Sequence, residues 1–252
     1  MSTPHLARVY DWALGGKDNF AVDREYGAKI VEAFPAYQLA VRNNRDFLAR
    51  AVTHLADAGI DQFLDLGSGL PTSPNIHEVA RRTRPDSRVV YVDNDPIVAV
   101  HNDAILASTE GVGSASADIR QPDAILGHPT VRHVIDFEKP LGLLLVAVLH
   151  NIPDEDDPDR IVAAYREVLA PGSHLVFSQA SSEGNAEVIA RTKEATDRGA
   201  IPITYRSREQ ITRFFSGLEL VEPGVVFVEN WRAEVEVHDT GLTGLGGVAR
   251  KN

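Results

Sequence analysis

The stretch FLDLGSGLPTSPNIHEVARR, residues 63–82, joins an apolar run to a helical pattern through a glycine turn. Such turns often bind phosphates through backbone N–H groups. Here Gly67 and Gly69 match the start of G-x-G-x-x-G, but Thr72 replaces the third glycine and no lysine follows, which excludes a Walker-type loop. The negative charge of Asp65, two positions before Gly67, would repel a pyrophosphate. The turn therefore favours a ligand with an ammonium group and no phosphate, and the alternative is a structural turn capped by Asp65.

Two further acids follow apolar runs. Asp93 ends VVYVDND, and an acid roughly 20 residues after a glycine turn binds ribose hydroxyls in nucleoside sites, including those of NAD enzymes. Its alternative role is to cap the helix after Pro96. Asp118, in SASADIR, could accept a hydrogen bond from an adenine amine, and with Gln121 it also forms an N-cap pattern.

An alternating scaffold is predicted to position these residues. We expect strands at residues 62–66, 88–92, 113–117, 143–149 and 174–179, and helices at 75–83, 96–108 and 159–169. Such alternation predicts an α/β fold with a doubly wound, mostly parallel sheet and right-handed crossovers. Ligands in these sheets bind beyond the carboxyl ends of the strands.

The flanking segments are predicted to be helical at the start and mixed at the end. Residues 21–57 have helical spacing interrupted at Pro35, and residues 184–198 form another predicted helix. Ser207 and Gln210 form a capping box for a helix that reaches about residue 216, and we expect a C-terminal antiparallel strand. We interpret residues 1–58 as an N-terminal helical cap and residues 59–252 as one compact ligand-binding domain.

The composition narrows the class of protein. The chain has 252 residues, 43% of them hydrophobic, and a formal net charge of -11, which disfavours nucleic acid and anionic membranes as main partners. The absence of cysteine excludes disulfides and thiolate zinc sites. The longest apolar run, residues 141–149, is shorter than a membrane span, and the N-terminus lacks a signal-peptide core. We expect a cytoplasmic protein with no membrane association, and the oligomeric state stays open, with a homodimer as one option.

The order DLGSG, VDND, ADI, LLLVAVLHNIPD and YREVLAPGSHLVFS resembles the motif series of class I S-adenosylmethionine-dependent methyltransferases. More narrowly, VYDWALGGKDNFAVDRE together with FLDLGSGLPT and VVYVDNDP is similar to an actinobacterial S-adenosyl methyltransferase family that was formerly a domain of unknown function. The resemblance implies a seven-stranded Rossmann-like sheet, S-adenosyl-L-methionine as cofactor, and methyl transfer to a small-molecule acceptor. This cofactor carries an amino group and a sulfonium but no phosphate, in agreement with the glycine turn.

The resemblance also implies roles for individual residues. The methionine part of the cofactor would be bordered by Asp65, Gly67, Ser68 and Gly69, the ribose and adenine by Asp93, Asn94, Asp118 and Ile119, and the sulfonium by Leu149 and His150.

A cover over the cofactor is expected from the N-terminal region. The adjacent glycines before Lys17 would allow close approach to a ligand or hinge a lid. The expected cover residues are Gly16, Lys17, Asn19, Asn44 and Arg45. Arg45 or Arg42 could pair with the cofactor carboxylate. The alternative is a surface helix with solvated charges.

His150 is the predicted general base, because an acceptor hydroxyl or amine must lose a proton and histidine titrates near neutrality. Its alternative is a histidine that lines the site without transferring protons. Tyr10 and Tyr205 are weaker candidates for the acceptor pocket. The acidic run at residues 154–157 is better explained by the dipole of the following helix than by a metal, so no metal site is predicted.

Two other functions remain open from the sequence. One is a non-catalytic sensor of S-adenosylmethionine or S-adenosylhomocysteine, which would lack an acceptor cavity beside the methyl group. The other is an NAD-linked oxidoreductase, which Asp65 and the missing third glycine disfavour.

Overall fold

The computed structural model describes residues 3–106, 109–197, 201, 203–234 and 244–252. Its sheet has the order β3-β2-β1-β4-β5-β8-β6, and β7 also pairs with β8. The strands are β1 (Gln62–Leu66), β2 (Arg88–Asp93), β3 (Val112–Ser116), β4 (Gly142–Val146), β5 (His174–Ala180), β6 (Glu219–Leu220), β7 (Val226–Phe227) and β8 (Gly244–Arg250). The first five are mutually parallel, and β8 runs antiparallel to β5. The predicted doubly wound sheet and its antiparallel C-terminal strand are confirmed.

Two details of the sheet differ from the sequence prediction. The fourth strand ends at Val146 rather than residue 149, because Ala147 adopts a left-handed φ of 55° and a 3₁₀ turn, η1 (Leu149–Asn151), follows. The short strands β6 and β7 pair with different parts of β8. The described chain therefore has eight strands where seven were expected, because two short strands, β6 and β7, lie beside β8.

Helices connect the parallel strands. They are α4 (Ile76–Ala80), α5 (Pro96–Leu106), α6 (Pro122–Leu126), α7 (Pro129–Val134), α8 (Pro158–Glu167), α9 (Ala186–Asp197) and α10 (Arg208–Arg213), with 3₁₀ turns η2 (Asp154–Asp156) and η3 (Val228–Asn230). The capping box before α10 is confirmed, because Ser207 accepts from the Gln210 N–H and the Gln210 side chain accepts from the Ser207 N–H. The N-cap predicted at Asp118 is wrong: α6 begins at Pro122, and the Asp118 carboxylate accepts from the Arg120 N–H instead.

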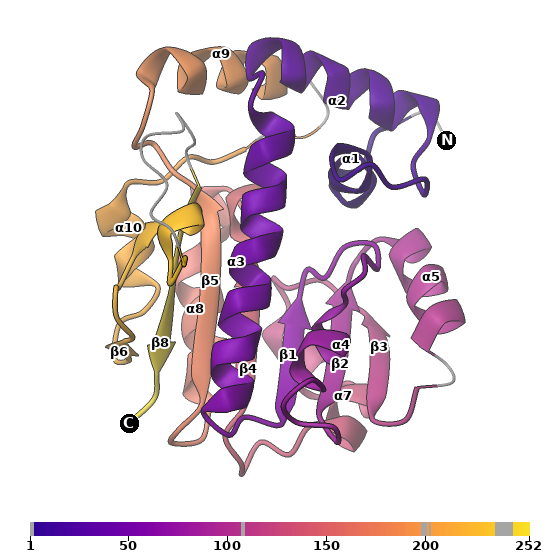
Figure 1. Cartoon of the computed structure of the whole chain (residues 1–252), viewed down its shortest axis with the longest axis vertical. Helices are drawn as coiled ribbons and strands as arrows, with labels where there is room; N and C mark the ends of the chain where they lie inside the picture. Colours follow the sequence, from indigo (N-terminus) through magenta and orange to yellow (C-terminus); the bar gives the residue numbers. More distant parts are fainter. Residues whose placement is uncertain (1–2, 107–108, 198–200, 202, 235–243) are drawn as a thin grey trace.

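Both faces of the sheet are covered. Every residue of β1 is buried, as expected for an inner parallel strand. Leu64 and Leu66 pack in the cluster that includes α8, whereas Phe63 packs against the C-terminal half of α3 (Tyr37–Asp57). In Figure 1, α3 runs the full height of the sheet. By this packing α3 contributes to the main core, so we propose that the cap consists of the elements before it and the first turns of α3.

The cap elements are α1 (Leu6–Ala13) and α2 (Ala21–Ala33), which stand with α9 above the carboxyl ends of the strands (Figure 1). One buried arginine fixes them. Arg8, 5% exposed, pairs with Asp23 of α2 at 2.9 Å and with Asp95 of the loop after β2 at 3.0 Å. Both carboxylates are buried, so the pairs are poorly screened by water and hold α1 at the sheet.

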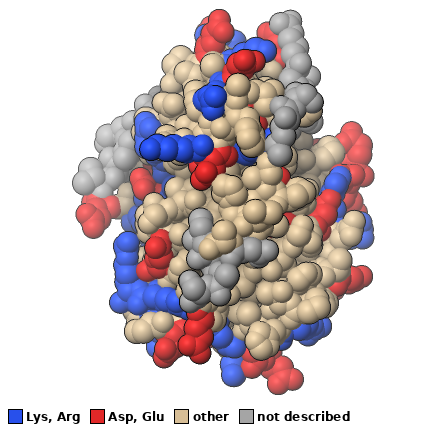
Figure 2. Space-filling model, turned by 90° about the vertical axis from the view of Figure 1, so that its right-hand side faces the viewer, with Lys and Arg blue, Asp and Glu red and all other residues tan. Residues whose placement is uncertain are grey.

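The surface carries charges of both signs. On the face in Figure 2, acidic and basic side chains are interspersed around uncharged surface. Within the described residues, no helix combines the length and apolar character needed to cross a membrane.

Trp231 tests how the C-terminal segment is held on α3. The side chain is fully buried and contacts the Phe47 ring edge-on, with centroids 5.6 Å apart. We expect Trp231→Ala to lower the free energy of unfolding by about 3–5 kcal/mol because it leaves a large cavity. Urea unfolding measures this, and Leu39→Ala, at a position 40% exposed on α3, should change stability by less than about 0.5 kcal/mol. Equal effects of the two variants would contradict the packing role.

Candidate functional site

A cavity of about 410 Å³ lies beyond the carboxyl ends of the parallel strands, under α1, α2, α3 and α9. Each of the five parallel strands contributes lining residues at or just after its end, among them, in spatial order from β3 to β5, Asp118, Asp93, Asp65, His150 and Ser178. Adjacent strands are about 4.8 Å apart, so this row spans roughly 19 Å. A cavity of that length can hold an extended ligand and a second molecule side by side.

The glycine turn forms the floor under the middle of the row. Gly67 and Gly69 have left-handed φ values of 77° and 64°. The Gly67 and Ser68 N–H groups both donate to the Val92 carbonyl, at 2.8 and 3.0 Å, which holds the turn against β2. A β-carbon on Gly67 would overlap the Val148 side chain. Glycine is therefore required here both for the backbone conformation and for the close packing of two loops.

Asp65 faces the cavity from the end of β1. It is 5% exposed, and its carboxylate has no hydrogen-bond or ion-pair partner among the described residues. Burial raises the pKa of Asp65 to about 7, an effect that Arg45 partly offsets and Asp93 increases. A buried carboxylate without a partner is stabilised by a cationic ligand.

Arg45 lies close to this acid on α3. Its terminal Nη2 donates to the carbonyls of Thr72 and Pro74, both at 2.9 Å, and its remaining N–H groups stay available. Arg42 is exposed and does not line the cavity, so of the two candidate arginines only Arg45 is in place to meet a ligand carboxylate.

Asp93 holds the loops around the turn. One carboxylate oxygen accepts from the Gly69 N–H at 2.8 Å and the other from the Asp95 N–H at 2.9 Å. Burial raises its pKa. The helix-capping role considered for Asp93 belongs to Asp95, whose carboxylate accepts from the Ile97 N–H. Asn94 lines the cavity beside them.

The third acid is already paired. Arg120 binds the Asp118 carboxylate at 2.6 Å and Asp156 at 3.2 Å. Hydrogen bonding by Arg120 lowers the pKa of Asp118. Asp118, Ile119 and Arg120 all line this end of the cavity.

His150 is held in one tautomer. The Ala180 N–H lies 3.3 Å from Nδ1, and because a backbone N–H can only donate, Nδ1 carries no proton. Burial, together with the Arg206 guanidinium, lowers the pKa of His150 to about 4, so the ring is neutral and its proton is on Nε2. Nε2 has no partner among the described residues. The imidazole therefore presents a hydrogen-bond donor, and this geometry argues against the predicted base role.

Arg206 supports the same turn from beneath. It is 2% exposed and donates to the carbonyls of Leu149 and Ile152 and to the Gln179 side chain, and it also pairs with Asp154 at 2.7 Å. These bonds hold the segment Leu149–Asn151, which carries His150, in its 3₁₀ turn.

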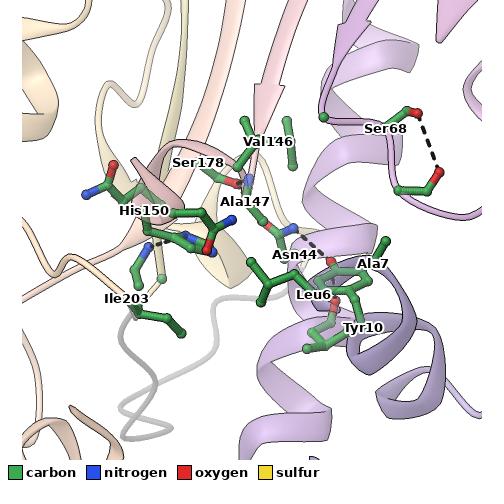
Figure 3. A pocket seen from close by; sticks show the side chains of 18 of the residues that line it. Leu6, Ala7, Tyr10, Asn44, Ser68, Val146, Ala147, His150, Ser178 and Ile203 are labelled. Atoms are coloured by element: carbon green, nitrogen blue, oxygen red, sulfur yellow. Dashed lines mark hydrogen bonds between the residues drawn. The ribbon is translucent and has the colours of Figure 1, made fainter. Parts of the chain in front are cut away.

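A hydrogen-bonded chain of side chains joins the roof to the sheet (Figure 3). The Ser178 hydroxyl donates to Asn44 Oδ1 at 2.6 Å, and Asn44 Nδ2 donates to the Tyr10 hydroxyl at 2.9 Å. Tyr10 donates in turn to the Val41 carbonyl at 3.3 Å. The Ala147 N–H donates to Ser178, so β4, β5, α3 and α1 are tied at one place.

The predicted site residues divide into two groups. Those that line the cavity are Tyr10, Asn44, Arg45, Asp65, Gly67, Ser68, Gly69, Asp93, Asn94, Asp118, Ile119, His150 and Tyr205. Those that do not are Gly16, Lys17, Asn19 and Leu149. Leu149 is fully buried in the core because η1 turns it inward.

The turn at residues 15–19 has a structural role instead. Asn19 donates to the Asp11 carboxylate at 2.8 Å, and the Asp18 N–H donates to it at 3.0 Å. A β-carbon on Gly16 would overlap that carboxylate. Gly16 therefore permits close packing on Asp11 rather than on a ligand, and Lys17 is exposed.

Several lining residues were missed by sequence reasoning. They come from the roof and from β5: Ile30, Phe34, Tyr37, Val41, Ser178 and Ile203. The helical spacing of Ile30 and Phe34 marked an apolar face, but nothing local indicated that this face would cover a ligand site.

The acidic run after η1 is used within the fold. Asp157 caps α8 by accepting from the Arg160 N–H, and Asp154 and Asp156 pair with Arg206 and Arg120. In the part of the chain that the structure describes, no group of three or more potential ligands is arranged to hold a metal.

This chain is similar to known proteins both by a family model and by comparison of structures. A family model described as S-adenosyl methyltransferase matches residues 1–252. A Thermobifida fusca protein provisionally named a methyltransferase superposes with a TM-score of 0.95 and 42% identity, over 100% of this chain and 96% of that one. A DUF574 family protein from Streptomyces avermitilis gives 0.95 and 41%, over 99% and 98%. The Bradyrhizobium japonicum N-methyltransferase NodS, in complex with S-adenosyl-L-homocysteine, shares the fold at a TM-score of 0.53 and 15% identity, over 97% and 98%. Among curated protein sequences none matches this chain.

The raised pKa of Asp65 makes the stability of the unliganded protein depend on pH. The neutral carboxyl is favoured in the fold, so stability is fully present below the unfolded pKa near 4 and is lost as pH rises through about 7. Because Asp65→Asn does not titrate, its unfolding free energy relative to wild type should rise by about 3 kcal/mol between about pH 4.5 and pH 8. Urea unfolding at the two pH values measures this.

The matched control is Asp61→Asn, at an exposed position just before the same strand. Because this side chain is exposed, the substitution should change the free energy of unfolding by less than about 0.5 kcal/mol at either pH. A difference between Asp65→Asn and wild type that stays constant with pH would mean that Asp65 ionises freely in the fold.

Proposed function

The chain belongs to the S-adenosyl methyltransferase family, and from this premise we propose that it transfers the methyl group of S-adenosylmethionine to a small molecule bound beside His150. The observation that carries the proposal is the buried carboxylate of Asp65 in the cavity, which has no hydrogen-bond or ion-pair partner in the part of the chain that the structure describes. The family's cofactor is S-adenosyl-L-methionine, whose amino-acid tail has the ammonium group that this carboxylate lacks as a partner.

The residues around Asp65 fit the rest of that tail. Arg45 offers free guanidinium N–H groups for the α-carboxylate of the cofactor. The left-handed backbone of Gly67 and Gly69 permits close approach. An amino group and a carboxylate would therefore each meet an opposite charge, which compensates for their burial.

The nucleoside would extend from there toward β3. The carboxylate oxygens of Asp93 keep lone pairs for ribose hydroxyls after accepting from the Gly69 and Asp95 N–H groups. Asn94, Asp118 and Ile119 border the next part of the cavity, where Ile119 offers an apolar contact to adenine. Asp118 is bound by Arg120, so an adenine amine would share a carboxylate that is already paired.

The cofactor supplies a methyl group on a positively charged sulfur, which is already a good leaving group. The chain mainly has to orient the acceptor in line with the S–C bond and exclude water, and such positioning can lower the barrier by several kcal/mol. A lone pair of the acceptor would form the new bond to the methyl carbon, and the electron pair of the S–C bond would remain on sulfur. We propose that His150 donates from Nε2 to the acceptor and holds it in place. An acceptor that carries an X–H group would release that proton to bulk solvent after methyl transfer, because Nδ1 of His150 is occupied by the Ala180 N–H.

The two other functions are less well supported. A sensor would need only the part of the cavity over β1, β2 and β3, whereas this cavity continues past His150 to Ser178 and Ile203. An NAD-linked enzyme would place a pyrophosphate near the turn, where Asp65 and Asp93 are both buried acids. Human N-acetylserotonin methyltransferase, whose structure was solved in complex with S-adenosylmethionine, has a similar fold.

Calorimetry with S-adenosylhomocysteine tests the cofactor site. We expect binding by the wild type at about pH 7.5, no binding of NAD, and a loss of about 1–3 kcal/mol in Asp65→Asn from removal of the charged partner. Asp61→Asn should bind like wild type. Binding of NAD alone, or unchanged affinity in Asp65→Asn, would contradict the proposed site.

The donor role of His150 can be tested before an acceptor is identified. Long-range ¹H–¹⁵N NMR, assigned with His150→Gln, should show the Nε2–H tautomer with no titration between about pH 5.5 and pH 8, because the Ala180 N–H occupies Nδ1. A ring that gains a proton within this range would restore the base role.

A further inference from the structure

The described lining residues of the cavity that carry charge are unevenly distributed along the row of strand ends. Its charged lining residues belong to the side over β1, β2 and β3: Asp11, Arg45, Asp65, Asp93, Asp118 and Arg120. Arg45 binds the loop after β1, and Arg120 binds Asp118 after β3.

Asp11 belongs to the same side despite its place on α1. Its carboxylate is engaged by Asn19 and by the Asp18 N–H. Asp18 in turn lies 3.9 Å from His101 of α5, the helix that follows β2. Asp11 therefore faces away from β4 and β5.

The side over β4 and β5 has no charged lining residue in the described chain. Its walls are Ile30, Phe34, Tyr37, Val41, Ile203 and Tyr205. Tyr37 interacts electrostatically with Tyr10, Tyr26 and Tyr205, which places these rings close together. Burial raises the pKa of Tyr37, so its phenol is uncharged. In Figure 3 Ile203 and His150 lie on one side of this space and Leu6 and Tyr10 on the other.

Several polar groups on this side are bonded to protein, and Asn151 also lines the cavity with a buried Oδ1 that has no partner among the described residues. Asn44, Ser178 and the Tyr10 hydroxyl bond to one another. The Nε2–H of His150 has no partner among the described residues. A ligand here therefore meets aromatic and apolar walls and at least one directed donor.

On the basis of the proposed function, we propose that the methyl acceptor is an uncharged aromatic molecule with a lone-pair atom that accepts from His150 Nε2. Flat ring faces of Phe34, Tyr37 and Tyr205 favour an aromatic ligand through offset or edge-on packing. Among the described lining residues of this side, a carboxylate or an ammonium group on the ligand would be buried without a counter-ion, at a cost that a hydrogen bond to His150 does not offset. The charged side of the cavity is reserved for the cofactor.

A matched ligand series tests the proposal on the full chain saturated with S-adenosylhomocysteine. The probes are 2-naphthol, 2-naphthoate, 2-naphthylmethylammonium and decahydro-2-naphthol, titrated by calorimetry at neutral pH. We expect 2-naphthol to bind at least about tenfold more tightly than either charged probe, because each charge is desolvated without a partner. It should also bind more tightly than the saturated alcohol.

A charge added to the uncharged side by substitution should change the order of affinities for the charged probes. Ile203→Lys adds a cation to the uncharged side and should raise the affinity for 2-naphthoate while lowering that for 2-naphthylmethylammonium. Leu39→Lys, on the outer part of α3 and outside the cavity lining, adds the same charge and should leave the ranking unchanged.

The outcomes separate this inference from the proposed function. Absence of S-adenosylhomocysteine binding would remove the proposed function itself. Normal binding of S-adenosylhomocysteine with equal or tighter binding of a charged probe would overturn the uncharged acceptor, and equal binding of decahydro-2-naphthol would overturn its aromatic character. If Ile203→Lys fails to fold, the wild-type series still decides.

Discussion

The candidate site is arranged around the buried carboxylate of Asp65, which has no hydrogen-bond or ion-pair partner among the described residues. Asp65 lies near the end of β1, where the sheet order places β2 and β3 on one side and β4, β5, β8 and β6 on the other. Burial favours its neutral form, and a cation or hydrogen-bond donors on a ligand would favour the ionised form. The nearby arginine, Arg45, is held by two backbone carbonyls and leaves that role to a ligand. In the proposed cofactor site, the position of this acid sets where the amino-acid tail would bind and, through the sheet order, which way the nucleoside would extend.

The roof combines a small apolar cluster, in which Val9, Tyr26 and Ile30 are buried, with buried polar contacts to the sheet. Arg8 ties α1 to α2 and to the loop that carries Asp95, and Asp95 bonds to Asp93. The loop after β2 and the first helix are thus connected through the carboxylates of Asp93 and Asp95. On the other side, Asn44 joins α1 and α3 to Ser178 of β5. The Asn44 connection is made by residues that line the cavity, whereas the Arg8 connection reaches the lining through Asp93.

The histidine after β4 illustrates how a backbone contact can change a side chain's chemistry. A histidine at this place in the sequence suggests a base, because its ordinary pKa lies near neutrality. In the fold, the Ala180 N–H occupies Nδ1 and Arg206 adds a positive charge nearby. The same ring then becomes a neutral donor. The N–H group that causes this change comes from Ala180, the last residue of β5.

By itself the sequence determined the alternating elements, the parallel sheet, the glycine turn and the acids at the strand ends, because hydrophobic period, glycine spacing and residue charge are local properties. The parallel strands then brought Asp65, Asp93 and Asp118 to one edge without further information. Only the tertiary structure decided that Leu149 faces the core, that Gly16 packs on Asp11, and that Ile30, Phe34 and Ile203 form one uncharged wall. These outcomes depend on contacts between segments far apart in the chain, and no local pattern records which distant surface a side chain will meet.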